Sequence, residues 1–288
     1  MNQRLITLFI IKIFVGLGLP AWSQSLFDDF EGKKLNAAIW KKANTKWGEN
    51  PSRGTHGGVI AENVYIEDGN LVIRAHGNFY DGNIWGHGQR TKVGGAVFTK
   101  KKYASGSYEV RARICPQPGA LSAFWTYYYK NDSINHEIDF EFPGRNQPPN
   151  SPKDSDITWG LMSNWTGVSD VHHRTADKYF GNQADGQYHL YRFEWHTGSD
   201  REKPRVEWYY DDKLMHTSYE TVPKRASKFW IGIWFPYWIG RADFIKDYMY
   251  VDWIKITKFK EPGDVTSRRT GWKRHRQEII TLPAGKDF

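Results

Sequence analysis

The sequence predicts an all-β domain made of two antiparallel sheets stacked face to face. Its hydrophobic runs are short, usually five to nine residues, and turn-forming residues separate them. At least ten such runs follow one another along the 288 residues, and helical periodicity is almost absent. This pattern is typical of strands that pair with their neighbours, so helix is expected only in short turns.

The first 23 residues are expected to be an export signal rather than part of the domain. A basic residue precedes the apolar segment 5–19, and the small residues Ala21 and Ser23 frame a cleavage position before Gln24. A membrane anchor is the alternative. Lys12 interrupts the apolar segment, however, which is shorter than the roughly 20 residues that a spanning helix needs. We therefore expect a secreted or periplasmic protein without a membrane span.

Residues 24–260 are long enough to form one domain with its own core, and we expect a monomer. The single cysteine, Cys115, has no partner for a disulfide within the chain, and it is expected to be a packed thiol rather than a nucleophile.

The formal net charge is +8, and removal of the two basic residues in the first 23 leaves +6. The basic residues are spread widely, which argues against a nucleic-acid partner. Residues 261–288 form a basic C-terminal extension, expected to be a strap over the domain or partly disordered.

The expected strands can be placed in order along the chain. Turn residues at Asp68-Gly69 predict a tight hairpin of type I′, and Asp211-Asp212 predict a second turn. The longest irregular segments, which are expected to wall a cleft, are 41–58, 77–94, 145–156 and 166–187. The expected strands are 63–66, 71–75, 95–99, 107–114, 121–129, 135–142, 157–165, 188–196, 206–215 (with its turn), 229–235 and 248–259.

The stretch from Asn135 to Gly144 carries the clearest chemistry. Glu137, Asp139 and Glu141 alternate with three apolar residues, and this period of two places the carboxylates on one face of a strand. Like charges so close cannot all ionise on a dry face, so one carboxyl keeps its proton while a neighbour stays ionised. Paired carboxyls in these two states are the machinery of glycoside hydrolysis. The alternative is a wet edge strand whose acidic residues only prevent edge pairing.

The geometry of that strand sets a condition on the sheet. Four residues of extended chain span roughly 13 Å, so the sheet must be concave if the two glutamates are to lean together.

Tryptophan is abundant, with 14 in the chain, which is more than a core usually needs. Indoles stack on the C–H faces of sugar rings, so tryptophans near the acidic strand predict a carbohydrate groove. Each of them could equally be a core residue. Those on or beside expected strands are Trp125, Trp159, Trp165, Trp234 and Trp238.

Together these residues resemble glycoside hydrolase family 16. The likeness is carried by the E-x-D-x-E strand at 137–141, by G-A-L-S-A-F-W at 119–125, by W-I-G-I-W at 230–234 and by V-D-W-I-K at 251–255. It runs from about residue 27 to residue 259. The resemblance implies a concanavalin-like β-jelly-roll with a concave catalytic sheet, and retaining hydrolysis of internal β-linkages in a polysaccharide.

The resemblance also implies roles for individual residues. Glu137 would be the nucleophile and Glu141 the general acid that later serves as base, while Asp139 between them would tune their protonation. Trp125 and Trp234 match stacking positions in the family's cleft.

Two further residues are candidates for substrate contact, and three for a metal. Trp238 and His136 could touch sugar, although His136 could also be a polar residue packed beside the strand. No cofactor is expected for the chemistry itself. Members of the family often carry a structural calcium ion on the convex side, and the matching positions are Asp29, the backbone of Gly69, and Asp252, which could also be a surface carboxylate.

The substrate is less clearly indicated. The E-x-D-x-E form resembles that of lichenases and of plant xyloglucan-active enzymes, but Asn135 stands where the lichenase pattern has a tryptophan. The G-I-W-F-P run at 232–236 and the basic chain resemble exported bacterial relatives that act on galactans. A β-1,3-galactan of the arabinogalactan type is therefore expected first, and mixed-linkage β-1,3-1,4-glucan is the alternative. A transglycosylase and a non-catalytic lectin-like protein are further alternatives, and the intact glutamates argue against the last.

Overall fold

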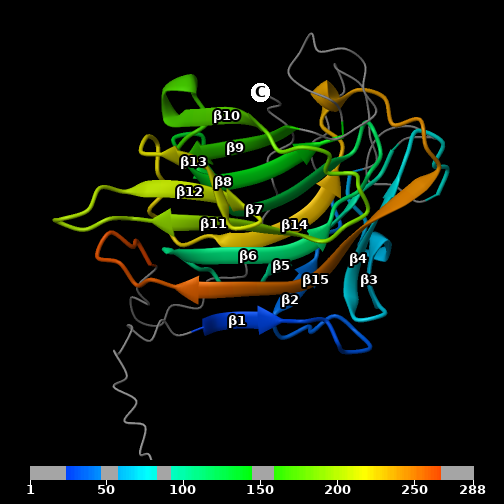
Figure 1. The fold of residues 1–288 in the computed structure, drawn as a ribbon, viewed down its shortest axis with the longest axis horizontal. Coiled ribbons are helices and arrows are strands. Elements are labelled where there is room, and N and C mark those ends of the chain that lie inside the picture. The colour runs from blue at the N-terminus through cyan, green and yellow to red at the C-terminus, as the bar shows by residue number, and fades with distance from the viewer. Residues whose placement is uncertain (1–23, 47–57, 83–91, 145–158, 267–288) are drawn as a thin grey trace, which may run out of the picture.

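Two antiparallel sheets packed face to face make up the described part of the chain, residues 24–46, 58–82, 92–144 and 159–266 of this computed structural model (Figure 1). The eight-stranded sheet has the order β13-β12-β11-β6-β15-β4-β3, and β1 also pairs with β15. Its strands are β1 (Gln24–Asp28), β3 (Val64–Glu67), β4 (Asn70–His76), β6 (Gly106–Arg113), β11 (His189–His196), β12 (Arg205–Tyr210), β13 (Lys213–Ser218) and β15 (Lys246–Lys258).

The seven-stranded sheet lies against the first and has the order β10-β9-β8-β7-β14-β5-β2. Its strands are β2 (Trp40–Lys42), β5 (Gly95–Thr99), β7 (Leu121–Asn131), β8 (Ile134–Pro143), β9 (Trp159–Trp165), β10 (His173–Tyr179) and β14 (Lys228–Trp234). In the described residues helix is limited to three short 3-10 turns, η1 (Ala61–Asn63), η2 (Asp170–His172) and η3 (Tyr237–Ile239). The predicted all-β class with two antiparallel sheets is therefore confirmed.

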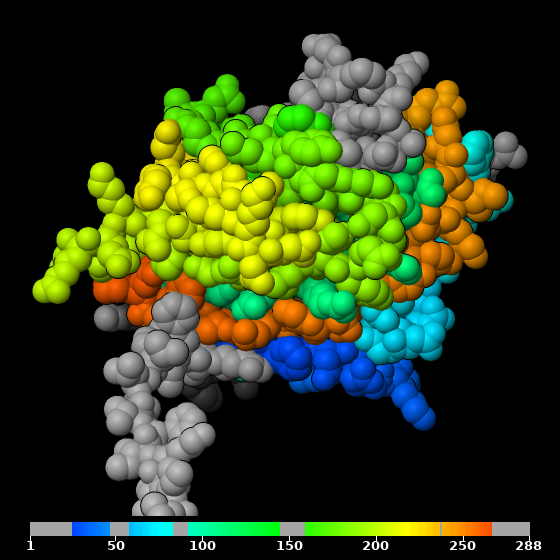
Figure 2. Space-filling view, viewed as in Figure 1, coloured from blue at the N-terminus to red at the C-terminus, as the bar shows by residue number. Residues whose placement is uncertain are grey.

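Aromatic side chains fill the space between the sheets. Phe124 of β7 and Phe142 of β8 point inward from one sheet and meet Tyr191 of β11 from the other, with ring centroids 5.0 and 4.8 Å apart. Alternation along each strand produces this layer, because every second side chain faces the partner sheet and loses its contact with water. Cys115 is buried in the same core, as predicted. Residues of β11 to β13 and of β15 lie on the side of the molecule toward the viewer in Figure 2.

The predicted hairpin turns are confirmed by the backbone. Asp68 and Gly69 have φ values of 48° and 69°, and Asp211 and Asp212 have φ values of 46° and 62°. Positive φ at both central residues is the requirement of a type I′ turn, whose twist matches that of the flanking strands.

Three strands of the structure are not predicted by the sequence pattern: β1, β2 and β10. The last of these, β10, lies inside a segment expected to be irregular. It is mostly polar and lies at the edge of its sheet, where β9 is its only strand partner among the described residues, so no apolar alternation marks it.

The C-terminal extension begins as a strap on the described fold. The Asp264 carboxylate accepts hydrogen bonds from the amide and hydroxyl of Ser105, and Val265 forms a bridge with Arg225. The predicted export signal, most of the predicted cleft loops at 47–57, 83–91 and 145–158, and residues 267–288 lie outside the described residues. The described part of the chain contains no helix that is long and apolar enough to cross a membrane.

Candidate active site

The three carboxylates of β8 lie on the face of the seven-stranded sheet that points away from the core. Their apolar neighbours Ile138 and Phe140 belong to the core between the sheets, so the odd-numbered residues face outward. Cross-strand pairing places Glu137 between Tyr127 of β7 and Trp165 of β9. The strand therefore presents its carboxylates as the period-two pattern predicted, and we call this surface the acidic face.

Hydrogen bonds from neighbouring side chains hold two of the carboxylates. Asn135 Nδ2 donates to Glu137 Oε2 at 3.2 Å, and Trp165 Nε1 donates to Asp139 Oδ2 at 2.8 Å. Asp139 is only 6% exposed, and its main-chain oxygen accepts a further bond, at 2.9 Å, from Trp208 Nε1 of the eight-stranded sheet. Asp139 is thus fixed from both sheets.

Burial and mutual repulsion raise the pKa of all three carboxyls. Burial raises the pKa of Glu137 to about 7, although hydrogen bonds from Asn135 and Asp139 oppose this. Burial and the charge of Glu137 raise the pKa of Glu141 to about 8. The pKa of Asp139 lies well above its ordinary value because Asp139 is buried and has both charged glutamates beside it. The site therefore retains protons at neutral pH.

An aromatic platform continues the acidic face across β7, β14 and β5. Trp230 stacks on Trp125 with ring centroids 5.6 Å apart and on Phe98 with centroids 4.1 Å apart. Trp125 and Trp230 are each only 5% exposed, whereas Tyr127 and Trp234 are half-buried at the border of the cluster. We call these five residues the aromatic platform.

On the other side of the carboxylates, β9 and β10 extend the same face. The Trp165 indole stacks on the His173 ring with centroids 3.7 Å apart. The hydroxyls of Ser163 and Thr175 share a hydrogen bond of 2.8 Å. Polar and aromatic groups thus flank the acidic strand on both sides, which is the composition expected of a carbohydrate-binding surface.

His136 does not share this face. As an even-numbered residue of β8 it points the other way, where the amide of Lys224 donates to its Nδ1 at 3.4 Å and the Tyr128 ring lies edge-on at 6.3 Å. Burial and the nearby charge of Arg225 lower the pKa of His136 to about 4, so the ring is neutral. The structure therefore does not bring His136 to the three carboxylates.

The other predicted site residues are placed as follows. Trp125 and Trp234 belong to the aromatic platform, and Trp238 is half-buried in η3, after β14. The calcium site stays a prediction. Asp252 Oδ2 accepts a hydrogen bond from Arg111 Nη1 at 2.5 Å, and Asp29 Oδ1 accepts one from the Glu31 amide, so a cation would have to compete with a guanidinium for Asp252.

Sequence reasoning did not assign Trp165, Tyr127, Trp230 or Asn135 to the site. Trp165 was noted as one tryptophan of several, and Asn135 only as a departure from a family pattern. Alternation along strand 157–165 could have placed Trp165 on a shared face, but only the register with β8 sets it beside Asp139.

Comparison with known proteins points in one direction. Residues 58–255 match the model of the glycosyl hydrolases family 16. A "Beta-glucanase" of Bacillus subtilis (strain 168) is 27% identical over 269 residues, which cover 89% of this chain and 98% of the relative. An "Endo-1,3-1,4-beta-glycanase ExoK" of Rhizobium meliloti (strain 1021) is 27% identical over 177 residues, covering 60% of this chain and 55% of that protein.

Solved structures share the fold. An endo-beta-1,3-glucanase from Pyrococcus furiosus superposes with a TM-score of 0.66 at 19% identity, covering 82% of this chain and 94% of that one. A Bacillus licheniformis beta-glucanase gives a TM-score of 0.62 at 22% identity, covering 81% and 97%. At sequence identities this low, the superpositions show that the two sheets are arranged as in those proteins, which is a statement about the fold alone.

Proposed function

The chain belongs to the glycosyl hydrolases of family 16, and on that premise we propose that it is a retaining endo-β-glucanase acting on internal linkages of a β-1,3-1,4- or β-1,3-glucan. The observation that carries the proposal is that β8 presents Glu137, Asp139 and Glu141 on one face that points away from the core, with the pKa of each carboxyl raised. With the pKa of Glu137 raised to about 7 and that of Glu141 to about 8, one carboxyl can be ionised while another keeps its proton near neutral pH. One carboxylate and one carboxylic acid on the same strand face are what the retaining reaction requires.

The proposed mechanism has two displacements. In the first, a Glu137 carboxylate oxygen forms a bond to the anomeric carbon while the bond to the leaving oxygen breaks and Glu141 donates its proton to that oxygen. In the second, Glu141 removes a proton from water, whose oxygen bonds to the anomeric carbon and displaces Glu137. Both residues return to their starting states.

Asp139 supports this cycle from between the two glutamates. Its raised pKa leaves it protonated, and its hydrogen bond to Glu137 stabilises the Glu137 carboxylate. The indole of Trp165 donates to Oδ2 of Asp139 and fixes this carboxyl. We infer that this chain of hydrogen bonds keeps Glu137 ionised and correctly oriented for attack.

The choice of a glucan follows the names of the relatives. The curated relatives named above are a β-glucanase and an endo-1,3-1,4-β-glycanase. The β-1,3-galactan expected first from the sequence has no support among them. Tyr127 and Trp234, the half-buried rings of the aromatic platform, can stack on the faces of either sugar.

The test compares three polymers and two variants. Mixed-linkage β-glucan, β-1,3-glucan and β-1,3-galactan are incubated with the purified protein, and the size and anomeric configuration of the first products are read by chromatography and NMR. Glucan cleaved to short oligosaccharides, with the β-configuration retained, supports the proposal. Cleavage of galactan alone overturns the choice of substrate, and transfer to an added sugar acceptor in preference to water identifies a transglycosylase.

Substitutions then test the site. Glu137→Gln and Glu141→Gln should each lower kcat by a factor of about 100 or more, because a neutral amide can neither attack nor donate as the acid does. Glu67→Gln, at the exposed end of β3 in the other sheet, is the control and should leave kcat unchanged. Full activity in both Glu137→Gln and Glu141→Gln would remove the site assignment.

We also propose that residues 1–23 direct export. The mature protein recovered outside the cytoplasm should then begin at Gln24, which N-terminal sequencing can establish.

A further inference from the structure

A second cluster of ionisable side chains lies on the eight-stranded sheet, away from the acidic face. Phe193 and Trp195 of β11 are buried in the core, so Glu194 and His196 point to the outer surface of the sheet. Glu207 of β12 pairs directly with Glu194 across the two strands. Two like charges directly opposite each other destabilise a sheet unless a cationic group lies between them.

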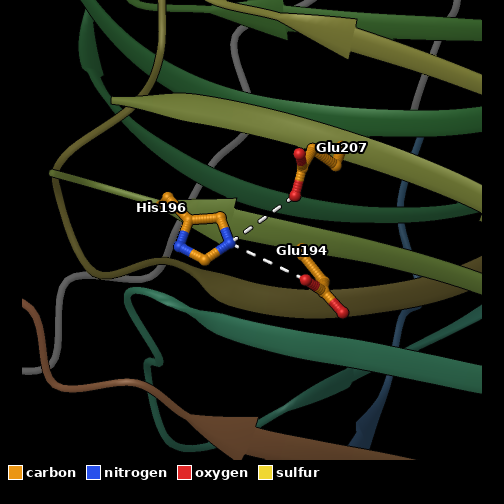
Figure 3. Close-up of side chains that lie close together, drawn as sticks. All are labelled: Glu194, His196 and Glu207. Atoms are coloured by element: carbon orange, nitrogen blue, oxygen red, sulfur yellow. Dashed lines mark ion pairs between the residues drawn. The ribbon is translucent and has the colours of Figure 1, made fainter. Parts of the chain in front are cut away.

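The His196 ring reaches toward both carboxylates (Figure 3). Its Nε2 atom lies 3.7 Å from Glu194 Oε2 and 3.8 Å from Glu207 Oε2. His196 is 8% exposed, and Nε2 itself is buried without a hydrogen-bond partner among the described residues. A buried nitrogen without a partner calls for an explanation. Because it points between two carboxylate oxygens, one cation could be coordinated by all three atoms.

The other ring nitrogen is already fixed. His196 Nδ1 lies 2.6 Å from Glu261 Oε1, and Glu261 Oε2 accepts bonds from the Gly198 amide at 2.8 Å and the Thr197 hydroxyl at 3.4 Å. With Nδ1–H donating to Glu261, Nε2 points at the two glutamates and can offer a lone pair to a metal ion only after it has lost its proton. A carboxylate behind a histidine is the usual support of a metal-bound imidazole.

The two glutamates are oriented in the same way. Oε1 of Glu194 forms an ion pair with Arg192, and Oε1 of Glu207 forms one with Arg205 at 3.1 Å. The Oε2 atom of each glutamate points toward His196. The Tyr209 hydroxyl also donates to Glu207 Oε2 at 3.3 Å. Both carboxylates therefore have one oxygen held in place and one directed into the gap.

We propose that Glu194, His196 and Glu207 form a binding site for a first-row divalent cation such as Zn²⁺. Tetrahedral zinc with bonds of roughly 2.0–2.1 Å needs ligand atoms about 3.4 Å apart. The two distances from His196 Nε2 exceed this by a few tenths of an ångström, and all three ligand atoms lie within 4.8 Å of one another. Three protein ligands leave the fourth position to water. The imidazole nitrogen disfavours Ca²⁺ and Mg²⁺, which prefer oxygen ligands.

Such an ion would act on stability rather than on hydrolysis. It would neutralise the Glu194–Glu207 repulsion and, through the bond between His196 and Glu261, attach the segment after β15 to β11.

A proton on the His196 ring competes with the metal ion for Nε2. Burial lowers the pKa of His196, but the nearby carboxylates of Glu194 and Glu261 outweigh it and raise the pKa to about 9. Zinc must displace this proton, so titrations belong at about pH 8 or above.

The experiment uses Zn²⁺ alone, titrated by calorimetry into the metal-free mature protein without an affinity tag. Wild type should bind one ion, and His196→Gln and Glu194→Gln should each weaken binding at least about tenfold. His189→Gln is the matched control, because His189 also lies between two carboxylates, Asp185 and Asp211, but has both ring nitrogens hydrogen-bonded. It should bind Zn²⁺ as the wild type does, and Ca²⁺ should not compete in any variant.

Thermal unfolding provides the second readout. Zn²⁺ should raise the Tm of the wild type and of His189→Gln but leave those of His196→Gln and Glu194→Gln unchanged. If His196→Gln does not fold, Glu194→Gln decides the question, since it keeps the shape of the side chain. Equal Zn²⁺ affinity in wild type and Glu194→Gln overturns the proposal. So does a wild type that binds no Zn²⁺ at concentrations up to ~100 µM, or loss of binding in His189→Gln.

Discussion

The indole of Trp165 donates a hydrogen bond to Asp139 from the neighbouring strand, at 2.8 Å, while its ring stacks on His173. One side chain thus links the carboxyl between the two proposed catalytic glutamates to the edge strand of the sheet. Because Asp139 is buried, loss of this donor leaves a polar oxygen without its partner.

Trp165→Phe should therefore lower both activity and stability. The phenyl ring keeps the stack on His173 but cannot donate to Asp139, at a cost of about 1–3 kcal/mol in the free energy of unfolding. Asp139 becomes less well oriented toward Glu137, so kcat should fall more than KM rises. Trp159→Phe, on the same strand but in contact with Tyr179, is the control and should keep its kcat. Steady-state kinetics that find the two variants alike would show that the Trp165–Asp139 bond does not matter for catalysis.

The activity should depend on pH through a bell-shaped profile. Below the Glu137 pKa of about 7 the nucleophile is protonated, and above the Glu141 pKa of about 8 the acid has lost its proton. Thus kcat/KM should peak between these values and fall about tenfold per pH unit on both sides. Initial rates on soluble β-glucan across this range provide the measurement. A profile whose acidic limb lies near pH 4 would show that burial does not raise the Glu137 pKa.

Stability should respond to pH in a defined direction as well. The folded-state pKa of Glu141 is raised, so its contribution is complete below the unfolded value of about 4.5 and is lost as the pH rises through about 8. The Glu141→Gln side chain does not ionise, so the variant does not lose this stability as the pH rises. Its free energy of unfolding should exceed that of the wild type by on the order of 1–3 kcal/mol at about pH 9, but not at about pH 4. Urea unfolding at both pH values checks the sign. A variant that is less stable than the wild type at the higher pH contradicts it.

His136→Ala should separate a packing role from sugar contact. The substitution removes an acceptor for the Lys224 amide and a ring against Tyr128, so the free energy of unfolding should fall by about 1 kcal/mol. The ring lies on the opposite face from the carboxylates, so KM should stay within about twofold of the wild type. A large rise in KM with unchanged stability would instead restore the prediction that His136 touches substrate.

The two tryptophans predicted as stacking residues should behave differently. Trp234 is half-buried at the border of the aromatic platform, and Trp234→Ala should weaken substrate binding by about 1–3 kcal/mol, by analogy with bases stacked on aromatic rings. Trp125 is only 5% exposed and stacks on its cross-strand neighbour Trp230, so Trp125→Ala should mainly destabilise the fold, by about 3–5 kcal/mol. Binding isotherms and thermal unfolding on both variants distinguish the roles. Equal effects on binding would place both rings against the sugar.

The sequence pattern within a single strand or turn was sufficient to predict which face its side chains occupy and how its backbone turns. Alternation alone placed Glu137 and its two acidic neighbours on one face, and the Asp68-Gly69 pair identified a hairpin whose turn has the predicted backbone. The same alternation would have set His136 on the opposite face. It was grouped with the site only because it is adjacent in the sequence.

Contacts between distant segments were beyond such reasoning. The bond from Trp165 to Asp139 requires the register of β9 against β8, which are separated by a long connection. Nothing in the polar strand β10 marks it except its partner across the sheet. The Glu194–His196–Glu207 cluster needs the pairing of β11 with β12, and Glu261 reaches it from 65 residues further along the chain than His196.

The bond from Trp208 to the main-chain oxygen of Asp139 crosses the core from one sheet to the other. An indole rooted in β12 thereby anchors the backbone beneath the reacting groups, so the two layers are not independent modules. A redesign confined to the eight-stranded layer, for instance to raise thermostability, would change how the opposite layer holds its carboxyls unless this tryptophan and its rotamer were kept.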